Sequence, residues 1–278
     1  MKKTQVLRGV VGVVCASILL AASLCADPVP YNITKDKSLY GHLDQRKVPV
    51  IGNCACAPTS AVNSFVYLQK KYPQLYDSKL IGDPDNEQQL INAVTALGEL
   101  MGTTCPGGTA DAMMAYGKAK YIEDNIPGVT KYRAMDNGTW GAPGAKPAWF
   151  EENTYPTWKF IYEELKACED VEIGFTRPDN SGHWVTVYEF KFTDTDNDGE
   201  IDAGETATLG FIDPWGGTDN VGTLTQDASG HLVVAYGNDA GTIDVAISES
   251  PIPEPMTVGL LGMGLSVVTW LRRRRRRG

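Results

Sequence analysis

Residues 182–192 read GHWVTVYEFKF, a run of aromatic and β-branched side chains that follows a polar turn. Such a run predicts a β-strand. Runs of the same kind predict further strands at 171–175, 207–212, 232–236 and 242–247. Upstream, apolar residues recur at helical spacing and predict helices at 59–71, 86–101, 107–121 and 155–168. Helices first and an antiparallel sheet second indicate an α+β fold.

Both ends of the 278-residue chain carry segments typical of protein sorting. A basic start and an apolar run at 10–22 predict a signal peptide over residues 1–26, removed by signal peptidase. A lipoprotein signal at Cys25 and a retained N-terminal anchor are the alternatives. Near the other end, residues 256–271 form an apolar run that predicts a transmembrane segment, and six arginines at 272–277 follow it.

The C-terminal segment as a whole resembles a known sorting signal. Pro253, Glu254 and Pro255 precede the apolar run and the arginine block, and this order resembles the PEP-CTERM signal. Exosortase-type transpeptidases recognise that signal in Gram-negative bacteria that make extracellular polysaccharide. The resemblance implies that residues 251–278 are a sorting segment, that the protein is anchored transiently in the inner membrane, and that its destination is the outer surface or the extracellular matrix. A plain tail anchor is the alternative.

Between these segments, residues 27–250 form one expected domain with a strongly acidic composition. The whole chain has a formal charge of −9. Without the three basic residues of the N-terminal segment, the six tail arginines and Glu254, 16 basic residues remain against 33 acidic ones, a charge of −17. A polyanion of this size is a poor partner for nucleic acid or anionic lipid. It is compatible with binding metal cations.

A candidate nucleophile lies directly before the first predicted long helix. Residues 52–60 read GNCACAPTS. Cys56 is closer to the helix start than Cys54, and Pro58 suits the first turn of a helix. The positive end of the helix dipole favours a thiolate, which is the nucleophilic form of cysteine.

A candidate general base and its partner lie in two of the predicted strands. His183 lies in a polar turn that leads into the strand that begins at Trp184. Asp213 lies at the end of the strand 207–212, before Pro214. A carboxylate on a neighbouring strand can accept a ring N–H of the histidine and hold its tautomer. His231 and His42 lack such a pattern, and we expect both to be exposed.

Three short motifs together resemble one enzyme family: CAPTS at 56–60, GHWVTV at 182–187 and IDPW at 212–215. They are similar to papain-like cysteine peptidases of the bacteriocin-processing, double-glycine type. The resemblance implies a papain-like α+β fold with Cys56 as nucleophile, His183 as base and Asp213 as orienting group. The family has a glutamine about six residues before the cysteine, for the oxyanion hole, and Val50 stands there. Asn53 is the candidate replacement donor, with Gln45 as another.

The other cysteines leave several disulfide patterns open. Cys54, Cys56, Cys105 and Cys168 are an even set in an oxidising compartment. One disulfide, Cys105–Cys168 or Cys54 with either of these, leaves Cys56 free for catalysis. Two disulfides would use all four and leave no nucleophile.

Residues 194–205 read DTDNDGEIDAGE and fit the twelve-residue calcium loop of an EF-hand at every diagnostic position. Calcium prefers six to eight oxygen ligands. Because strands and not helices flank the loop, we expect a structural calcium site inserted in a hairpin. A solvated acidic turn is the alternative reading. No organic cofactor is expected. The expected carboxylate ligands are Asp194, Asp196, Asp198, Glu200, Asp202 and Glu205.

These patterns together predict an exported, surface-sorted cysteine peptidase-like hydrolase that is stabilised by calcium. Its substrate would be a peptide or protein, cleaved at a peptide or amide bond. The alternative is a catalytically inactive protein that binds within the extracellular polysaccharide as a matrix component. A cysteine acyltransferase of the transglutaminase type would share the same triad.

Overall fold

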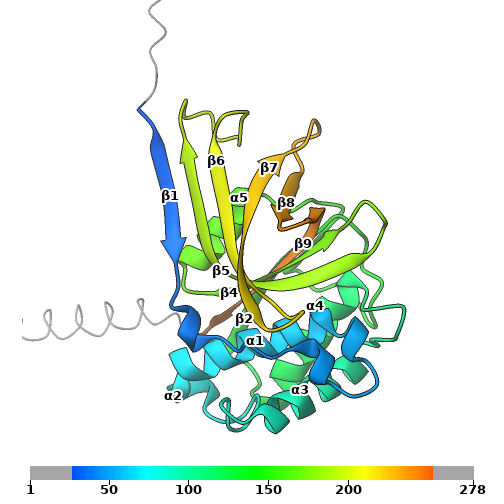
Figure 1. Cartoon of the computed structure of the whole chain (residues 1–278). Coiled ribbons are helices and arrows are strands. Elements are labelled where there is room, and N and C mark those ends of the chain that lie inside the picture. The colour runs from blue at the N-terminus through cyan, green and yellow to red at the C-terminus, as the bar shows by residue number, and fades with distance from the viewer. Residues whose placement is uncertain (1–26, 253–278) are drawn as a thin grey trace, which may run out of the picture.

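A computed structural model describes residues 27–252 of the protein (Figure 1). The predicted signal peptide, the transmembrane segment 256–271 and the sorting motif Pro253, Glu254 and Pro255 lie outside this range. Among the helices of the described residues, we find none with the length and apolar character needed to cross a bilayer.

The described part of the chain is organised around one nine-stranded sheet. Its strands run in the order β1-β5-β6-β7-β8-β9-β2-β3, and β4 pairs with both β5 and β9. All pairs are antiparallel except β2–β3. The bounds are β1 Val29–Thr34, β2 Thr130–Asp136, β3 Phe150–Glu152, β4 Asp170–Thr176, β5 Gly182–Asp194, β6 Thr206–Asp213, β7 Thr218–Gln226, β8 Leu232–Tyr236 and β9 Asp239–Pro251.

Strand β4 closes the sheet into a ring of six strands, β4 to β9. Its residue Val171 faces Val187 of β5 on one side and Ser248 of β9 on the other. Gly174 permits the close approach, because a Cβ there would lie 2.6 Å from Val245 Cγ1 and 2.9 Å from the Trp184 ring. Closure of this kind removes much of the free edge of the six strands, and β1 covers the part of β5 that extends beyond β4, as β2 covers the part of β9 that extends beyond β8.

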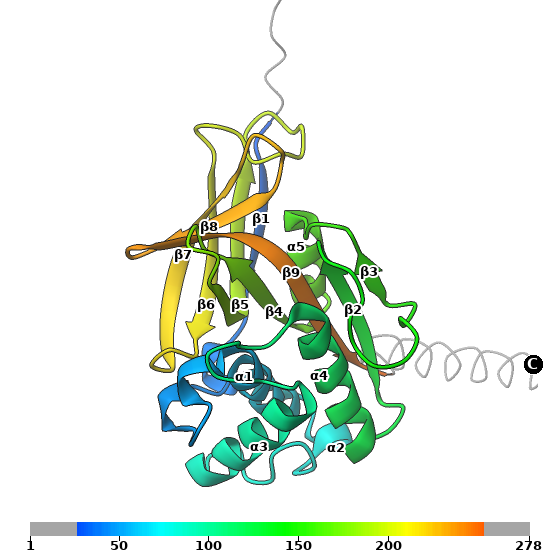
Figure 2. The same cartoon turned by 90° about the vertical axis from the view of Figure 1, so that its right-hand side faces the viewer.

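The helices cover the sheet on two sides. Helix α1 (Cys56–Lys71) packs against β4 and β5, and α3 (Glu87–Leu100) and α4 (Asp111–Asn125) pack beside it (Figure 2). The short α2 (Pro73–Tyr76) follows α1 directly. Helix α5 (Trp158–Lys166) packs instead against β1, β4 and β5. Three 3₁₀ turns, Lys37–Leu39, Gln45–Lys47 and Gly52–Cys54, connect β1 to α1.

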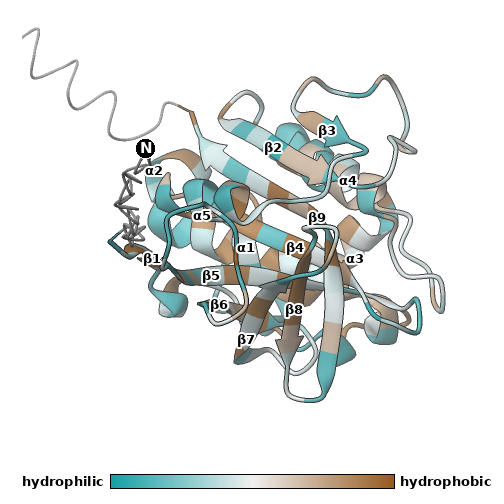
Figure 3. Ribbon diagram, turned by 90° about the horizontal axis from the view of Figure 1, so that it is seen from above, coloured by the Kyte–Doolittle hydropathy of each residue, from teal (hydrophilic) through white to brown (hydrophobic). Residues whose placement is uncertain are grey.

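Two apolar clusters fill the spaces on either side of the sheet. One joins α1, α3 and α4 to the sheet through residues such as Phe65 and Trp184. The other lies among α5 and the strands of the ring, and includes Trp158, Phe190 and Phe211. Figure 3 shows apolar stretches along β7 and β8 and polar loops at the periphery.

A buried ionic cluster connects α4 to the sheet, and nothing in the sequence pattern predicted it. Lys118 of α4 is fully buried, and its ammonium donates to Glu172 of β4 and Glu249 of β9, with Asp170 at 3.4 Å. Burial raises the pKa of Glu172, Lys118 partly opposes this, and the pKa lies at about 7. Three carboxylates around one ammonium fix the position of α4 on the sheet.

The α+β, papain-like fold that the sequence predicts is wrong. The protein is mostly antiparallel sheet, six of whose strands close on themselves, and helices are the smaller part. The expectation failed because no strand was predicted at the positions of β1, β2, β3 and β7, and because the sequence pattern of β4 does not reveal that it pairs with β9 as well as with β5. The predicted helices and strands themselves are present, with shifted ends: the helix expected from residue 59 begins at Cys56, and the one expected from 107 begins at Asp111.

Candidate functional site

Cys56 is the first residue of α1, and its side chain is half-buried. The N–H groups in the first turn of a helix have no partner within the helix, and they stabilise negative charge placed beside them. Helix α1 is 16 residues long and is held against β4 and β5 by a face of buried residues that includes Val62, Phe65 and Val66. The sulfur is therefore presented at a rigid helix start.

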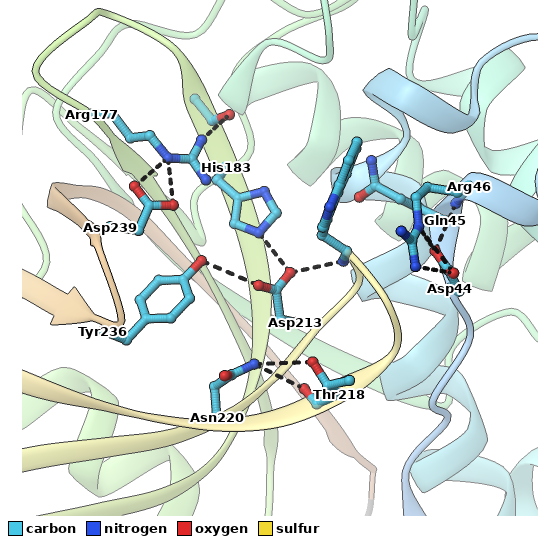
Figure 4. A network of polar contacts seen from close by, with 12 residues as sticks. Asp44, Gln45, Arg46, Arg177, His183, Asp213, Thr218, Asn220, Tyr236 and Asp239 are labelled. Carbon is cyan, nitrogen blue, oxygen red and sulfur yellow. Dashed lines mark hydrogen bonds and ion pairs between the residues drawn. The ribbon is translucent and has the colours of Figure 1, made fainter.

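His183 and Asp213 lie side by side on adjacent strands of the ring. Their strands, β5 and β6, pair in antiparallel register, and His183 Nε2 lies 2.8 Å from Asp213 Oδ1 (Figure 4). The same Oδ1 accepts the Trp215 backbone N–H at 2.8 Å, and Oδ2 accepts the Tyr236 hydroxyl at 3.2 Å. Three donors thus fix the carboxylate of Asp213, which in turn fixes the imidazole of His183.

Cys56 is the other residue that acts on His183, and both line the same cavity. Burial alone lowers the pKa of His183, but hydrogen bonds with Asp213 and Cys56 outweigh it and raise the pKa to about 9. Because Nε2 is used by Asp213, Nδ1 is the ring nitrogen that remains for the sulfur. The sequence-predicted Cys56, His183 and Asp213 therefore lie together at one site, with His183 hydrogen-bonded to Asp213 and adjacent to Cys56.

These three residues line a cavity of about 680 Å³, within the range of small-molecule and peptide sites. Trp215, which is 48% exposed, also lines it. The Arg46 guanidinium lies 5.5 Å from the centre of the Trp215 ring.

Gln45 and Asn53 both line this cavity, so both candidate oxyanion donors are at the site. Gln45 is buried, and its Nε2 donates one hydrogen to the Gly52 carbonyl at 2.9 Å. An amide carries two such hydrogens, so Gln45 keeps a second one as a candidate oxyanion donor. Asn53 is exposed. Val50 stands where the resembling family has its oxyanion glutamine, but it is 97% exposed with a φ of 68°. That position is therefore part of a solvent-facing turn and not of the cavity wall.

The candidate disulfide Cys105–Cys168 is wrong. Cys54 pairs with Cys105, with Cα atoms 5.5 Å apart, whereas Cys56 and Cys168 are free thiols. Cys168 lies just after the C-terminal end of α5, and its backbone carbonyl accepts hydrogen bonds from the hydroxyls of Tyr67 and Tyr72. The observed pairing is one of the alternatives that leaves Cys56 free, and it ties the loop after Cys105 to the turn that carries Cys56.

The remaining histidines lie outside the cavity. His42 is exposed, as expected, and its Nε2 lies 3.0 Å from Asp219 Oδ1. His231 stacks on Tyr155 with ring centres 3.7 Å apart, and lies 3.4 Å from Asp227.

The acidic loop lies between β5 and β6, on the hairpin that carries His183 and Asp213 at its other end. Carboxylate oxygens of Asp194, Asp196 and Asp198 lie within 4.8 Å of one another, so these three fit a common cation. Neighbouring carboxylates, Asp198 first, raise the pKa of Asp202. Glu205 instead accepts the backbone N–H groups of Thr195 and Asp202.

Two contacts anchor this loop to the rest of the protein. Trp158 of α5 donates its indole N–H to the Gly199 carbonyl at 2.9 Å. Gln226 of β7 accepts the Ile201 backbone N–H and donates to Glu200 at 2.9 Å. The loop conformation is therefore coupled to α5 and to the sheet.

Comparison of the chain with protein-family models and with curated proteins finds no match to either. The assignment of chemistry to the cavity consequently depends on its geometry. Sequence reasoning missed Tyr236, Asp111 and Asp244, which also line the cavity. Each is a single polar residue in a strand or at a helix start, and no local motif marks it.

Proposed function

We propose that this protein is a cysteine hydrolase of peptide or amide bonds. The observation that carries the proposal is the buried His183–Asp213 pair beside the Cys56 thiol in the wall of a 680 Å³ cavity. A nucleophile, a base and an orienting group in this order are what acyl transfer to cysteine requires.

The chemistry follows from the roles of the three side chains. Cys56 Sγ forms a bond to the substrate carbonyl carbon, and the proton of its thiol resides on His183. The imidazolium gives this proton to the leaving amine as the C–N bond breaks, which leaves a thioester on Cys56. Water, deprotonated by His183, then hydrolyses the thioester and releases the acid. The Cys56 backbone N–H and the second amide hydrogen of Gln45 are the donors available for the oxyanion.

The test is alkylation of the folded, non-reduced protein with iodoacetamide, followed by peptide mapping. We expect rapid labelling of Cys56, slower labelling of Cys168, and peptide hydrolysis that disappears in Cys56→Ala but persists in Cys168→Ser. Labelling of both thiols at the rate of free cysteine, together with no hydrolysis from a peptide library, would favour the alternative of an inactive binding or matrix protein.

We also propose that the loop 194–205 binds calcium as a structural ion. Asp194, Asp196 and Asp198 already converge, and oxygen ligands of this kind suit Ca²⁺. Bound calcium would neutralise the repulsion among these carboxylates and stabilise the β5–β6 hairpin. We expect chelation with EGTA to lower the melting temperature and to change Trp158 fluorescence through its bond to Gly199.

The matched control for the calcium proposal is Asp227→Asn, an exposed aspartate in the turn between β7 and β8. Asp194→Asn, at the loop position where the pattern requires aspartate, should abolish the effect of calcium on the melting temperature, and Asp227→Asn should preserve it. An identical melting temperature with calcium and with EGTA would refute the site.

The cellular location is a proposal from the sequence alone. The predicted signal peptide and the resemblance of residues 251–278 to a PEP-CTERM signal support export and sorting to the outer surface by an exosortase-type enzyme. The resemblance of the three motifs to bacteriocin-processing peptidases supports the proposed chemistry only. The papain-like fold that it implied is not the fold of this protein. Mass spectrometry of the mature protein would locate both cleavage sites, and an uncleaved chain would overturn this proposal.

A further inference from the structure

The cavity beside Cys56 contains more negative charge than its own partners neutralise. Two of its acidic residues are paired: Asp213 with His183, and Asp239 with Arg177, whose Nε lies 2.7 Å from both carboxylate oxygens (Figure 4). The two other charged residues that line the cavity are Asp111 and Asp244. Both are acidic.

Asp111 is the first residue of α4, and no hydrogen bond or ion pair reaches its carboxylate from residues 27–252. Burial raises its pKa to about 7, and the charges of Asp136 and Asp244 add to this effect. The three carboxylates therefore share one region of negative potential. Asp136, at the end of β2, lies behind the cavity wall and is 1% exposed.

Asp244 is 8% exposed and lies on β9. Its Oδ1 accepts the Asn137 side-chain N–H at 3.0 Å. Burial raises the pKa of Asp244 and Thr176 partly offsets this, but Oδ2 is buried with no partner in hydrogen-bond geometry. Asp244 also lines a second hollow of about 320 Å³, so it stands where the two meet. An unpaired buried carboxylate oxygen is costly, and a positive charge bound in the adjoining cavity would offset part of that cost.

The position of this acidic wall relative to the nucleophile is fixed covalently. The Cys54–Cys105 disulfide joins the turn before Cys56 to the loop that leads into α4. Residues 106–109 of that loop line the cavity, and Asp111 follows them. A group bound at Asp111 is therefore held at a set distance from Cys56.

We propose that Asp111 and Asp244 form a subsite for an organic cation of the peptide substrate, an ammonium or guanidinium group bound beside Cys56. This inference deepens the proposed hydrolase function by naming its substrate class. A metal ion fits less well: among the described residues, the groups of three or more acidic side chains that converge within 4.8 Å are those around Lys118 and those of the loop 194–205. Carboxylates spread along a cavity wall suit an extended, hydrogen-bond-donating cation.

The cation can come from a lysine or arginine side chain or from the free N-terminus of the peptide. The probes are glycine pentapeptides that carry one lysine, norleucine or glutamate at each position in turn, with a free or an acetylated N-terminus. Binding is measured by calorimetry on the full chain carrying Cys56→Ala, so that no peptide is cleaved. Lysine and norleucine differ in charge at similar length, which makes the pair a matched comparison.

We expect lysine to bind about tenfold more tightly than norleucine at one position, and glutamate to bind more weakly than both. Asp111→Asn and Asp244→Asn should each remove this preference. The control Asp85→Asn, in an exposed ion pair with Lys70, should retain it. If acetylation removes the affinity whichever side chain is present, the cation is the N-terminal amine.

Equal affinities for lysine and norleucine peptides with free and blocked termini would overturn the subsite, as would no binding of any cationic peptide at millimolar concentration. Hydrolysis by the wild-type chain is measured in parallel. Hydrolysis without a cation preference refutes the subsite and preserves the hydrolase. Cation-selective binding without hydrolysis refutes the hydrolase and preserves the subsite.

Discussion

Substitution of Asp213 by asparagine isolates the electrostatic part of the triad. The pKa of His183, at about 9, lies above the ordinary histidine value of roughly 6.5, and this difference corresponds to about 3 kcal/mol in favour of the imidazolium. Burial opposes the charged form, so the partners of His183 must overcome it. With a neutral amide at 213, burial should dominate and the pKa of His183 should fall below its ordinary value.

The expected consequence is a slower reaction of Cys56 at low pH. An ordinary thiol with a pKa near 8.5 is only about 1% thiolate at pH 6.5, so loss of the imidazolium partner in Asp213→Asn should slow alkylation there, by at most about 100-fold. The assay is the rate of iodoacetamide labelling of Cys56 from pH 5 to 10, in a Cys168→Ser background. The NMR titration of the His183 ring reports its pKa directly.

The same group makes the stability of the protein depend on pH. Because folding raises the pKa of His183, its contribution is fully present below pH 6.5 and is lost as pH rises through about 9. The wild-type free energy of unfolding in urea should therefore fall by up to about 3 kcal/mol across this window, and Asp213→Asn should show a flatter profile. Asp219→Asn, which removes the partner of the exposed His42, is the control. Wild-type labelling rates and pH dependence in Asp213→Asn would refute the reasoning.

Three further predictions concern other parts of the structure. Replacing both Cys54 and Cys105 by serine should lower the free energy of unfolding in guanidinium by about 4 kcal/mol, because the disulfide closes a loop with a sequence separation of 51. The control Cys168→Ser, at an exposed free thiol, should leave the free energy of unfolding unchanged. Equal effects of the two changes would contradict this prediction. Lys118→Met should lower the free energy of unfolding in urea by about 3–5 kcal/mol, because it leaves buried carboxylates without their cation. The loss should be larger at pH 8 than at pH 5.5, since Glu172 ionises between these two pH values. Lys120→Met, on the exposed face of the same helix, should have almost no effect at either pH. Gln45→Ala should lower the rate of peptide hydrolysis about 10²–10³-fold, with Asn53→Ala as the comparison, and a larger loss in Asn53→Ala would reverse the assignment of the oxyanion donor.

The candidate triad was predictable from the sequence because each member lies within a local motif. A cysteine before a helix, a histidine before a strand and an aspartate after one are set by short-range patterns. Their convergence requires only that the helix start and two adjacent strand ends meet, and the β5–β6 pairing achieves this.

The closure of the sheet and the acidic wall were not predictable in this way. Strand β4 reads as an ordinary short strand, and nothing local indicates that it pairs with β9 as well as with β5. Asp111 and Asp244 are 133 positions apart in the sequence, and they face one cavity because α4 and β9 are packed by long-range contacts. Gln45 was considered but could not be preferred, since a turn with an exposed Val50 lies between it and Cys56.

The pairing of β1 with β5 has a consequence for the order of folding. Val29 lies opposite Asp194, so the first strand cannot dock until residue 194 has been synthesised and β5 has formed. Contacts of such sequence separation form slowly. Until then the outer edge of β5 is open to any strand, including β1 of a second molecule, which gives this chain a specific route to domain-swapped dimers at high concentration.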